Sequence, residues 1–303
     1  MKPCVLRVRN FALALCVAVA AANGGVQNVT GSCEANRTMV HPKGQRAAIL
    51  AVKRVNANRV PGDLVEVGVW MGGMSCILAL THLHDEAQSN SQVAKRSVWL
   101  FDTFQGMTAP TEDDGAVANK LYELVSTGGT PKVRDDPLRW NRDNRWNYSP
   151  LEEVRRTMAQ SKFPEHRIHF VVGPAEETLR LGAEAASRGR GISSSATGEH
   201  EHRLKAGDES LAVPEQIAVM RLDTDWYAST KAELEVLWPR LQPGGFMAVD
   251  DYFTWGGASK AVNEWLQEHN WTQAAHDVHA FTRGGVNYVY KNKPFNASWP
   301  FSR

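Results

Sequence analysis

Acidic residues follow two apolar runs in the second half of this 303-residue chain. The run Ile217–Leu222 leads into Asp223-Thr224-Asp225, and the run at residues 246–249 leads into Asp250-Asp251. Both runs are short and rich in large apolar side chains, which is typical of strands buried on both faces. Because the carboxyl ends of neighbouring parallel strands meet at one edge of a sheet, we expect the acids to gather there.

Carboxylates gathered in this way repel one another unless a cation or several hydrogen-bond donors lie between them. All-oxygen ligation suits magnesium, calcium or manganese. The alternative is helix capping, by Asp225 or Ser229 after the first run and by Asp251 after the second. Capping accounts poorly for Asp223 and Asp250, whereas Asp225 stays open between the two roles. The pattern therefore indicates a site for a hard divalent cation.

A glycine-containing turn follows the first predicted strand. Its pattern is E-x-G-x-x-x-G-G, from Glu66 through Gly68 to Gly72 and Gly73, and it differs from the G-x-G-x-x-G of dinucleotide-binding proteins. Glycines there let the backbone turn tightly and approach a ligand closely. Asp102 ends the second predicted strand, where a carboxylate can accept hydrogen bonds from both ribose hydroxyls of an adenosine. Asp102 alone could be a helix cap or a surface acid, but together with the turn it predicts an adenosine-containing cofactor.

The elements that would position these residues alternate from Gly62 onward. Strands are predicted at residues 64–69, 98–101, 168–172, 217–222 and 246–249, with a last strand near an edge at 286–291. Helices are predicted at residues 45–56, 74–83, 150–161, 229–237 and 258–268. This alternation predicts an α/β fold with a doubly wound, mostly parallel sheet and an antiparallel edge strand.

Two stretches interrupt the alternation. Residues 108–148 are polar and contain glycine and tryptophan, so we expect a lid-like segment or binding loop there. Residues 185–212 are rich in Ser, Gly, His and charge, so we expect a disordered surface insertion. The predicted organisation is a signal or targeting peptide at 1–22, a linker at 23–44, one domain at 45–292 and a tail at 293–303.

The N-terminus has the composition of a secretory signal. Basic residues precede an apolar run at 11–22, and the first 33 residues contain no acid. That run is shorter than the roughly 20 residues that span a bilayer, so we expect a cleaved signal and no stable membrane span. A transit peptide for an organelle is the alternative. Sequons favour a glycoprotein in the secretory lumen or outside the cell. They lie at Asn28, Asn36, Asn147, Asn270 and Asn296.

Cysteine usage and charge narrow the protein class. Cys33 and Cys76 lie outside the targeting segment and could form a disulfide in an oxidising compartment. We favour the other interpretation, in which Cys76 is a small apolar residue of a buried helix. Lys and Arg number 34 and Asp and Glu number 33, so no net charge recruits nucleic acid.

Four segments resemble the macrocin O-methyltransferase family, in the same order along the chain. They are GDLVEVGVWMGG, VWLFDTFQGM, RLDTDWYASTKAELEVLWPRLQPGG and VDDYFTWGGASKAVNEW. The resemblance runs from about Gly62 to Lys291 and implies a Rossmann-like class I methyltransferase fold. It also implies S-adenosyl-L-methionine and Mg2+ as cofactors, a sugar-containing small molecule as acceptor, and homo-oligomers.

The resemblance implies roles for individual residues. Those that would bind the cofactor are Glu66, Gly68, Gly72 and Asp102. Those that would ligate the metal are Asp223, Asp250 and Asp251. Asp223 would also be the catalytic residue that accepts a proton from the acceptor hydroxyl. The N-terminal leader and the insertion at 185–212 depart from the family pattern.

Two other functions fit part of the sequence. Asp223-Thr224-Asp225 is an Asp-x-Asp motif that could hold a metal and a nucleotide sugar in a luminal glycosyltransferase. That alternative leaves the glycine turn and Asp250-Asp251 unexplained. A non-catalytic carbohydrate- or metal-binding protein could also use the same scaffold.

Overall fold

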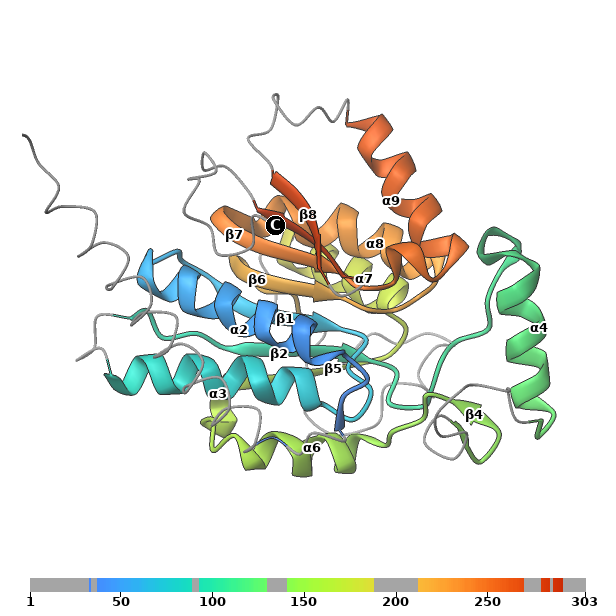
Figure 1. Ribbon diagram of the computed structural model, residues 1–303, viewed down its shortest axis with the longest axis horizontal. Coiled ribbons are helices and arrows are strands. Elements are labelled where there is room, and N and C mark those ends of the chain that lie inside the picture. The colour runs from blue at the N-terminus through green and yellow to red at the C-terminus, as the bar shows by residue number, and fades with distance from the viewer. Residues whose placement is uncertain are drawn as a thin grey trace, which may run out of the picture.

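The computed structural model describes Cys33 and residues 37–88, 93–129, 141–187, 212–269, 279–283 and 286–290. The predicted targeting peptide and tail lie outside these ranges. Seven strands form the central sheet, in the order β5-β2-β1-β6-β7-β9-β8 (Figure 1). Their bounds are β5 Ile168–Val172, β2 Val98–Asp102, β1 Asp63–Val67, β6 Ile217–Leu222, β7 Leu241–Val249, β9 Val286–Tyr290 and β8 His279–Arg283. The first five are parallel, and β9 is antiparallel to both of its neighbours.

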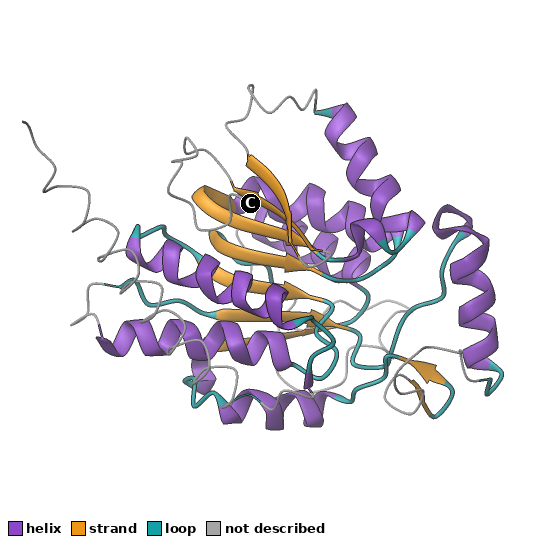
Figure 2. Cartoon of the chain, in the orientation of Figure 1, coloured by secondary structure: helices purple, strands orange, loops and turns teal. Residues whose placement is uncertain are grey.

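Helices cover both faces of the sheet (Figure 2). On one face lie α2 (Pro42–Ala57), α3 (Gly73–Gln88) and α6 (Leu151–Gln160), and on the other lie α7 (Ala175–Ser187), α8 (Tyr227–Leu237) and α9 (Gly256–Glu268). Successive strand residues serve opposite faces, because side chains alternate along a strand. In β1, Leu64 packs in the cluster of α2 and α3, and Val65 packs in that of α7 and α8. This two-sided burial explains why the strands read as continuous apolar runs.

The predicted doubly wound, mostly parallel α/β sheet is confirmed, with differences at its ends. β1 stops at Val67 because Gly68, with φ +80°, turns the chain away. The antiparallel strand is present as β9, but β8 lies outside it, so β8 is the edge strand. The helix α2 begins at Pro42, three residues before the predicted start, since proline suits the first turn of a helix.

The segment at 108–148 contains more regular structure than a binding loop. It includes η2 (Glu112–Asp114), α4 (Gly115–Ser126) and a short hairpin of β3 (Asn141–Arg142) and β4 (Arg145–Trp146). In Figure 1, α4 stands to one side of the sheet rather than on either face. The prediction that disorder begins at residue 185 is wrong, because Ala185 is buried in the last turns of α7. Residues 188–211 lie outside the described residues.

Cys33 and Cys76 form a disulfide, with 6.0 Å between their Cα atoms. Both residues are buried, so the favoured interpretation of Cys76 as an unpaired apolar residue is wrong. The bond ties the chain that precedes α2 to the first turn of α3. Within the described ranges, no helix has the length and apolar character needed to cross a bilayer.

Candidate active site

A cleft of about 540 Å³ opens at the carboxyl ends of the parallel strands. Segments from several parts of the chain line it. They are the stretch before α2, the glycine turn after β1, the end of β2 with the loop that follows, and the loops after β5, β6 and β7. The predicted site residues on the cleft wall are Glu66, Gly68, Asp102, Asp223, Asp250 and Asp251. These six residues lie together because each is at or near the carboxyl end of a parallel strand, and those ends meet at one edge of the sheet.

The glycine turn after β1 packs closely against the loop after β6. A Cβ atom on Gly68 would lie 2.0 Å from the carbonyl oxygen of Asp223, so no other residue fits there. Gly72, with φ +82°, faces elsewhere: its Cβ would meet the Val154 side chain of α6 at 2.9 Å. Gly72 therefore allows α3 to start against α6, and it is absent from the cleft lining.

Asp102 holds the glycine turn in place. Its Oδ2 accepts hydrogen bonds from the backbone N–H groups of Val69 (2.7 Å) and Trp70 (3.1 Å), and its Oδ1 accepts one from Phe104 (2.8 Å). Burial raises the pKa of the Asp102 carboxyl above its ordinary value, and these backbone bonds oppose the shift. Asp102 lies where a ribose-binding acid was predicted, but its observed partners belong to the turn itself.

A buried arginine joins three of the predicted acids. Arg221 Nη1 lies 2.7 Å from Glu66 Oε1 and 2.6 Å from Asp223 Oδ2, and Nη2 pairs with Asp250 Oδ2. Ser75 donates its hydroxyl hydrogen bond to the other oxygen of Glu66. Burial alone would lower the pKa of Arg221, but Asp223, Asp250 and Glu66 raise it well above its ordinary value. Burial raises the pKa of Glu66, and Arg221 and Ser75 oppose that shift.

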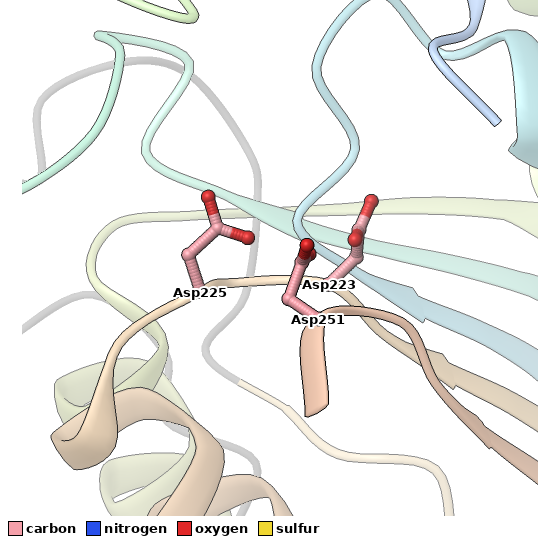
Figure 3. A group of neighbouring side chains, drawn as sticks. All are labelled: Asp223, Asp225 and Asp251. Carbon is pink, nitrogen blue, oxygen red and sulfur yellow. The ribbon is translucent and has the colours of Figure 1, made fainter. Parts of the chain in front are cut away.

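Three acids form a compact group in the cleft (Figure 3). Oxygen atoms of Asp223, Asp225 and Asp251 lie within 4.8 Å of one another. Burial, followed by mutual repulsion, raises the pKa of Asp251 to about 9, and burial with nearby acids raises that of Asp225 to about 7. Burial likewise raises the pKa of Asp223 well above its usual range. All three side chains are only partly buried, so water and ions can reach them.

This group differs from the predicted ligand set in one member. Asp250 pairs with Arg221 instead of joining the group, and Asp225 takes its place. Asp225 reaches the cleft because its backbone adopts the left-handed conformation, with φ +70°. Asp225 does not cap the helix α8, which begins without a side-chain cap bond from its N-cap residue. The first amide of α8, that of Tyr227, donates to Asp114 Oδ1 at 2.6 Å.

A tryptophan cluster forms an apolar wall of the same cleft. Trp146, Trp226 and Trp255 meet edge to face, with ring centroids 5.3–5.9 Å apart. Trp226 Nε1 donates to the carbonyl oxygen of Thr108 at 2.9 Å, and Leu121 of α4 packs on the cluster. The lid-like segment is therefore docked on the loop that carries Asp225. No period in the sequence marked this cluster, since its members come from three distant segments.

The stretch before α2 forms another wall. Residues from Arg37 to His41 line the cleft, and a Cβ on Gly73 would lie 2.4 Å from the carbonyl oxygen of Arg37. The start of α3 thus packs directly on this stretch. Gln45 Nε2 also donates to the Val40 carbonyl oxygen at 2.8 Å. The Cys33–Cys76 disulfide lies just before this wall in the chain, so it anchors a part of the cleft that was predicted to be linker.

Arg221 is the site residue that the sequence analysis missed. The available signal was a single charged residue inside the otherwise apolar run Ile217–Leu222. A charged side chain in a strand buried on both faces needs an oppositely charged partner. Its partners are as far as 155 residues away in the chain, so the signal predicts an ion pair without identifying it.

Comparisons with known proteins agree with this architecture. The sequence profile described as Macrocin-O-methyltransferase (TylF) matches residues 28–144 and 208–283. The 8-demethyl-8-(2,3-dimethoxy-alpha-L-rhamnosyl)-tetracenomycin-C 4'-O-methyltransferase of Streptomyces olivaceus is 32% identical over 202 residues, which cover 66% of this chain and 57% of that protein. The demethyldecarbamoylnovobiocin O-methyltransferase of Streptomyces niveus is 29% identical over 216 residues, which cover 71% of this chain and 62% of that protein. The chain thus spans 57–62% of the length of these two relatives.

Among solved structures, the O-methyltransferase NovP has a similar fold. The superposition has a TM-score of 0.58 and 27% sequence identity, and it covers 85% of this chain and 83% of NovP. The matched ranges include the glycine turn, Asp102 and the acids Asp223, Asp225, Asp250 and Asp251. The chain belongs to the macrocin O-methyltransferase family.

Proposed function

We propose that the protein is an O-methyltransferase that uses S-adenosylmethionine and a divalent cation to methylate a hydroxyl of a sugar or glycosylated small molecule. The observation that carries the proposal is the position of the acid group. Asp223, Asp225 and Asp251 lie in one cleft with the glycine turn, in a chain of a methyltransferase family. Family membership also favours methyl transfer over a glycosyltransferase that would use Asp223-Thr224-Asp225.

The turn and its neighbours fit S-adenosylmethionine as the cofactor. Gly68 leaves the backbone bare at the cleft, and Glu66 and Asp102 place acids beside it. Such acids can bind the ammonium and hydroxyl groups of that molecule. Bound there, S-adenosylmethionine would supply an electrophilic methyl group on a sulfonium.

The acid group fits magnesium by its chemistry. Three carboxylates within 4.8 Å offer hard oxygen ligands. Burial first and nearby acids second raise the pKa values of Asp225 and Asp251, so a bound cation would stabilise their charged forms. Mg2+ held by Asp223, Asp225 and Asp251 would supply Lewis-acid stabilisation of an alkoxide. Asp250, predicted from the family motif as a ligand, pairs with Arg221 and lies outside this group.

The remaining steps fall to the protein. With bound S-adenosylmethionine supplying the methyl group and leaving as S-adenosylhomocysteine, a carboxylate oxygen of the cleft would accept the proton of the acceptor hydroxyl. Asp223 is the predicted base. Asp225 is a second candidate, since its carboxylate lies beside that of Asp223 in the same acid group. The walls of the cleft hold donor and acceptor in line, which is the main source of rate for a displacement of this kind.

A sugar-bearing acceptor accords with the tryptophan wall and with the relatives. Trp226 and Trp255 present aromatic surface at the cleft, and such surface packs on the apolar face of a ring. The name of the Streptomyces olivaceus relative specifies a rhamnosyl group. The test is transfer of labelled methyl from S-adenosylmethionine to a panel of neutral glycosides, with magnesium and with chelator. Failure of every glycoside in the panel would count against this acceptor class.

A secretory location is a further part of the proposal. The Cys33–Cys76 disulfide supports it, because such bonds persist in oxidising compartments. Asn147 is a poor glycosylation site there, since its amide lies in the cleft and donates to Met107 Sδ at 3.3 Å. Mass spectrometry of the secreted chain would locate the cleavage point and the glycans, and light scattering would give the oligomeric state that the family implies.

A further inference from the structure

Arg221 is one of the residues that line the cleft. Its side chain is 6% exposed, and its guanidinium contacts acids from three strand ends. Glu66 belongs to β1 and lies beside Arg221 in the register of β1 with β6. Asp223 follows β6, and Asp250 follows β7. A single planar group therefore connects the glycine-turn side of the cleft with the acid side.

We propose that Arg221 is a positioning residue, which sets the cofactor site and the acid group at a fixed separation. The inference rests on the proposed function and extends it to a residue that acts through the acids with which it pairs. Arg221 holds Glu66 on one side and Asp223 on the other through the same nitrogen, Nη1. A shift of Glu66 therefore displaces Asp223 by way of the guanidinium.

Arg221 also divides the acids of the cleft between two roles. It compensates Glu66 and Asp250, which are turned toward it, and leaves Asp225 and Asp251 facing the cleft with one oxygen of Asp223. Without Arg221, the carboxylates of Glu66, Asp223 and Asp250 would lose the cation that they share. The arginine thus decides which acids are available to a cation.

Lysine should not replace Arg221. The guanidinium presents two nitrogens in a planar fork, so that Nη1 pairs with Glu66 and Asp223 while Nη2 pairs with Asp250, whereas an ammonium presents one nitrogen. Arg221→Lys keeps the charge but leaves one nitrogen where the fork contacts three carboxylates. A matched control exists in Arg96, which is also buried but lies beside the amino ends of the strands. Arg96 donates to Asn56 Oδ1 at 3.0 Å and to the Val60 carbonyl oxygen at 2.7 Å.

The experiment compares Arg221→Lys with Arg96→Lys in the full chain. We expect both to lower the melting temperature. Only Arg221→Lys should raise the Kd for S-adenosylmethionine, measured by calorimetry, by about ten- to a hundredfold, as expected for losing hydrogen bonds to a charged group. It should also lower kcat with the acceptor, since Asp223 moves. Equal Kd and kcat in both variants would show that Arg221 only stabilises the fold.

Glu66→Gln provides a second variant in case Arg221→Lys does not fold. It is isosteric and removes one buried charge while keeping an acceptor for Nη1. Because Arg221 links the two sides, Glu66→Gln should change the Kd for Mn2+, although Glu66 is outside the acid group. An unchanged Kd for Mn2+ in a folded Glu66→Gln chain would overturn the inference. If the wild-type chain bound neither S-adenosylmethionine nor Mn2+, the proposed function would fail first, and this inference with it.

Discussion

The carboxylate of Asp102 lies 2.7 Å from the backbone nitrogen of Val69, so the acid that ends β2 fixes the turn that ends β1. The same oxygen accepts the next amide, that of Trp70, at 3.1 Å. Trp70 has φ +47°, which is costly for a tryptophan. Two hydrogen bonds to one carboxylate oxygen stabilise that conformation. The cofactor turn is thus formed by two strands, and its shape depends on the charge state of Asp102.

Asp102→Asn should weaken the binding of S-adenosylmethionine. One end of the asparagine side chain would place an N–H group against a backbone N–H, so the turn would lose part of its support. We expect a loss of about 1–3 kcal/mol in binding free energy by calorimetry.

Asp63→Asn is the matched control for that variant. Asp63 begins β1 and accepts hydrogen bonds from the Ser97 amide at 2.8 Å and from Trp99 Nε1 at 2.9 Å. Asp63 therefore connects β1 with β2 as Asp102 does, but at the opposite end of this pair of strands. Asp63→Asn should lower stability and leave the Kd unchanged, and an equal loss of affinity in both variants would refute a local role for Asp102.

The two candidate ligand sets can be separated by neutral isosteres. Asp225→Asn should reduce the affinity for Mg2+, because it removes one charge from the group of three acids. Asp250→Asn should reduce it less, since Asp250 pairs with Arg221. Titration with Mn2+, followed by its paramagnetic signal, gives both dissociation constants. The opposite order would restore the set Asp223, Asp250 and Asp251 predicted from the family motif.

The effect of magnesium on stability should increase with pH. Burial and nearby acids raise the pKa of Asp225 to about 7 and that of Asp251 to about 9, from 3.8. Between roughly pH 4 and pH 9 the folded chain therefore binds more protons than the unfolded chain, and stability falls as pH rises. A cation replaces those protons, so the increase in Tm on adding Mg2+ should grow across this range. An increase in Tm that is the same at every pH would argue against these acids as ligands.

Breaking the disulfide should both destabilise the chain and weaken cofactor binding. The bond closes a loop with a sequence separation of 43, for which losses of about 2–4 kcal/mol are typical. Replacing Cys33 and Cys76 by serine, followed by urea unfolding, measures this loss. The Kd for S-adenosylmethionine should rise as well, since the wall from Arg37 to His41 loses its anchor. Reducing agent should reproduce both effects in the wild type and have none in the double variant.

Much of the sheet could be predicted because its parallel strands are buried on both faces and read as apolar runs. Among the strands of the main sheet and the helices that cover it, two elements were not predicted. In the helix α7, Leu179 is the one large apolar side chain among the buried residues, and the others are small. The strand β8, with the sequence HAFTR, has no continuous apolar run. Both lie beside elements that were predicted, so tertiary packing supplies what local pattern does not.

The sequence predicts where the site lies in the fold, but it does not predict which way the side chains of the site point. Topology alone gathers Glu66, Asp102, Asp223 and Asp250 at one edge. Whether Asp225 or Asp250 joins the acid group depends on the backbone conformation after each strand. The spacing of residues in the sequence does not predict the φ of +70° at Asp225. The Cys33–Cys76 pairing likewise depends on a Cα separation that only folding sets.

Calorimetric titration of the wild-type chain with S-adenosylmethionine, and separately with a UDP-sugar, tests whether the cleft binds a methyl donor. Each titration is run with magnesium and with chelator. We predict saturable binding of S-adenosylmethionine, with a Kd of about 1 µM to 1 mM, which is the range of typical KM values. S-adenosylhomocysteine should displace it, and the UDP-sugar should not bind. Binding of the UDP-sugar in the presence of magnesium, with no heat from S-adenosylmethionine, would contradict the proposal that the protein is a methyltransferase.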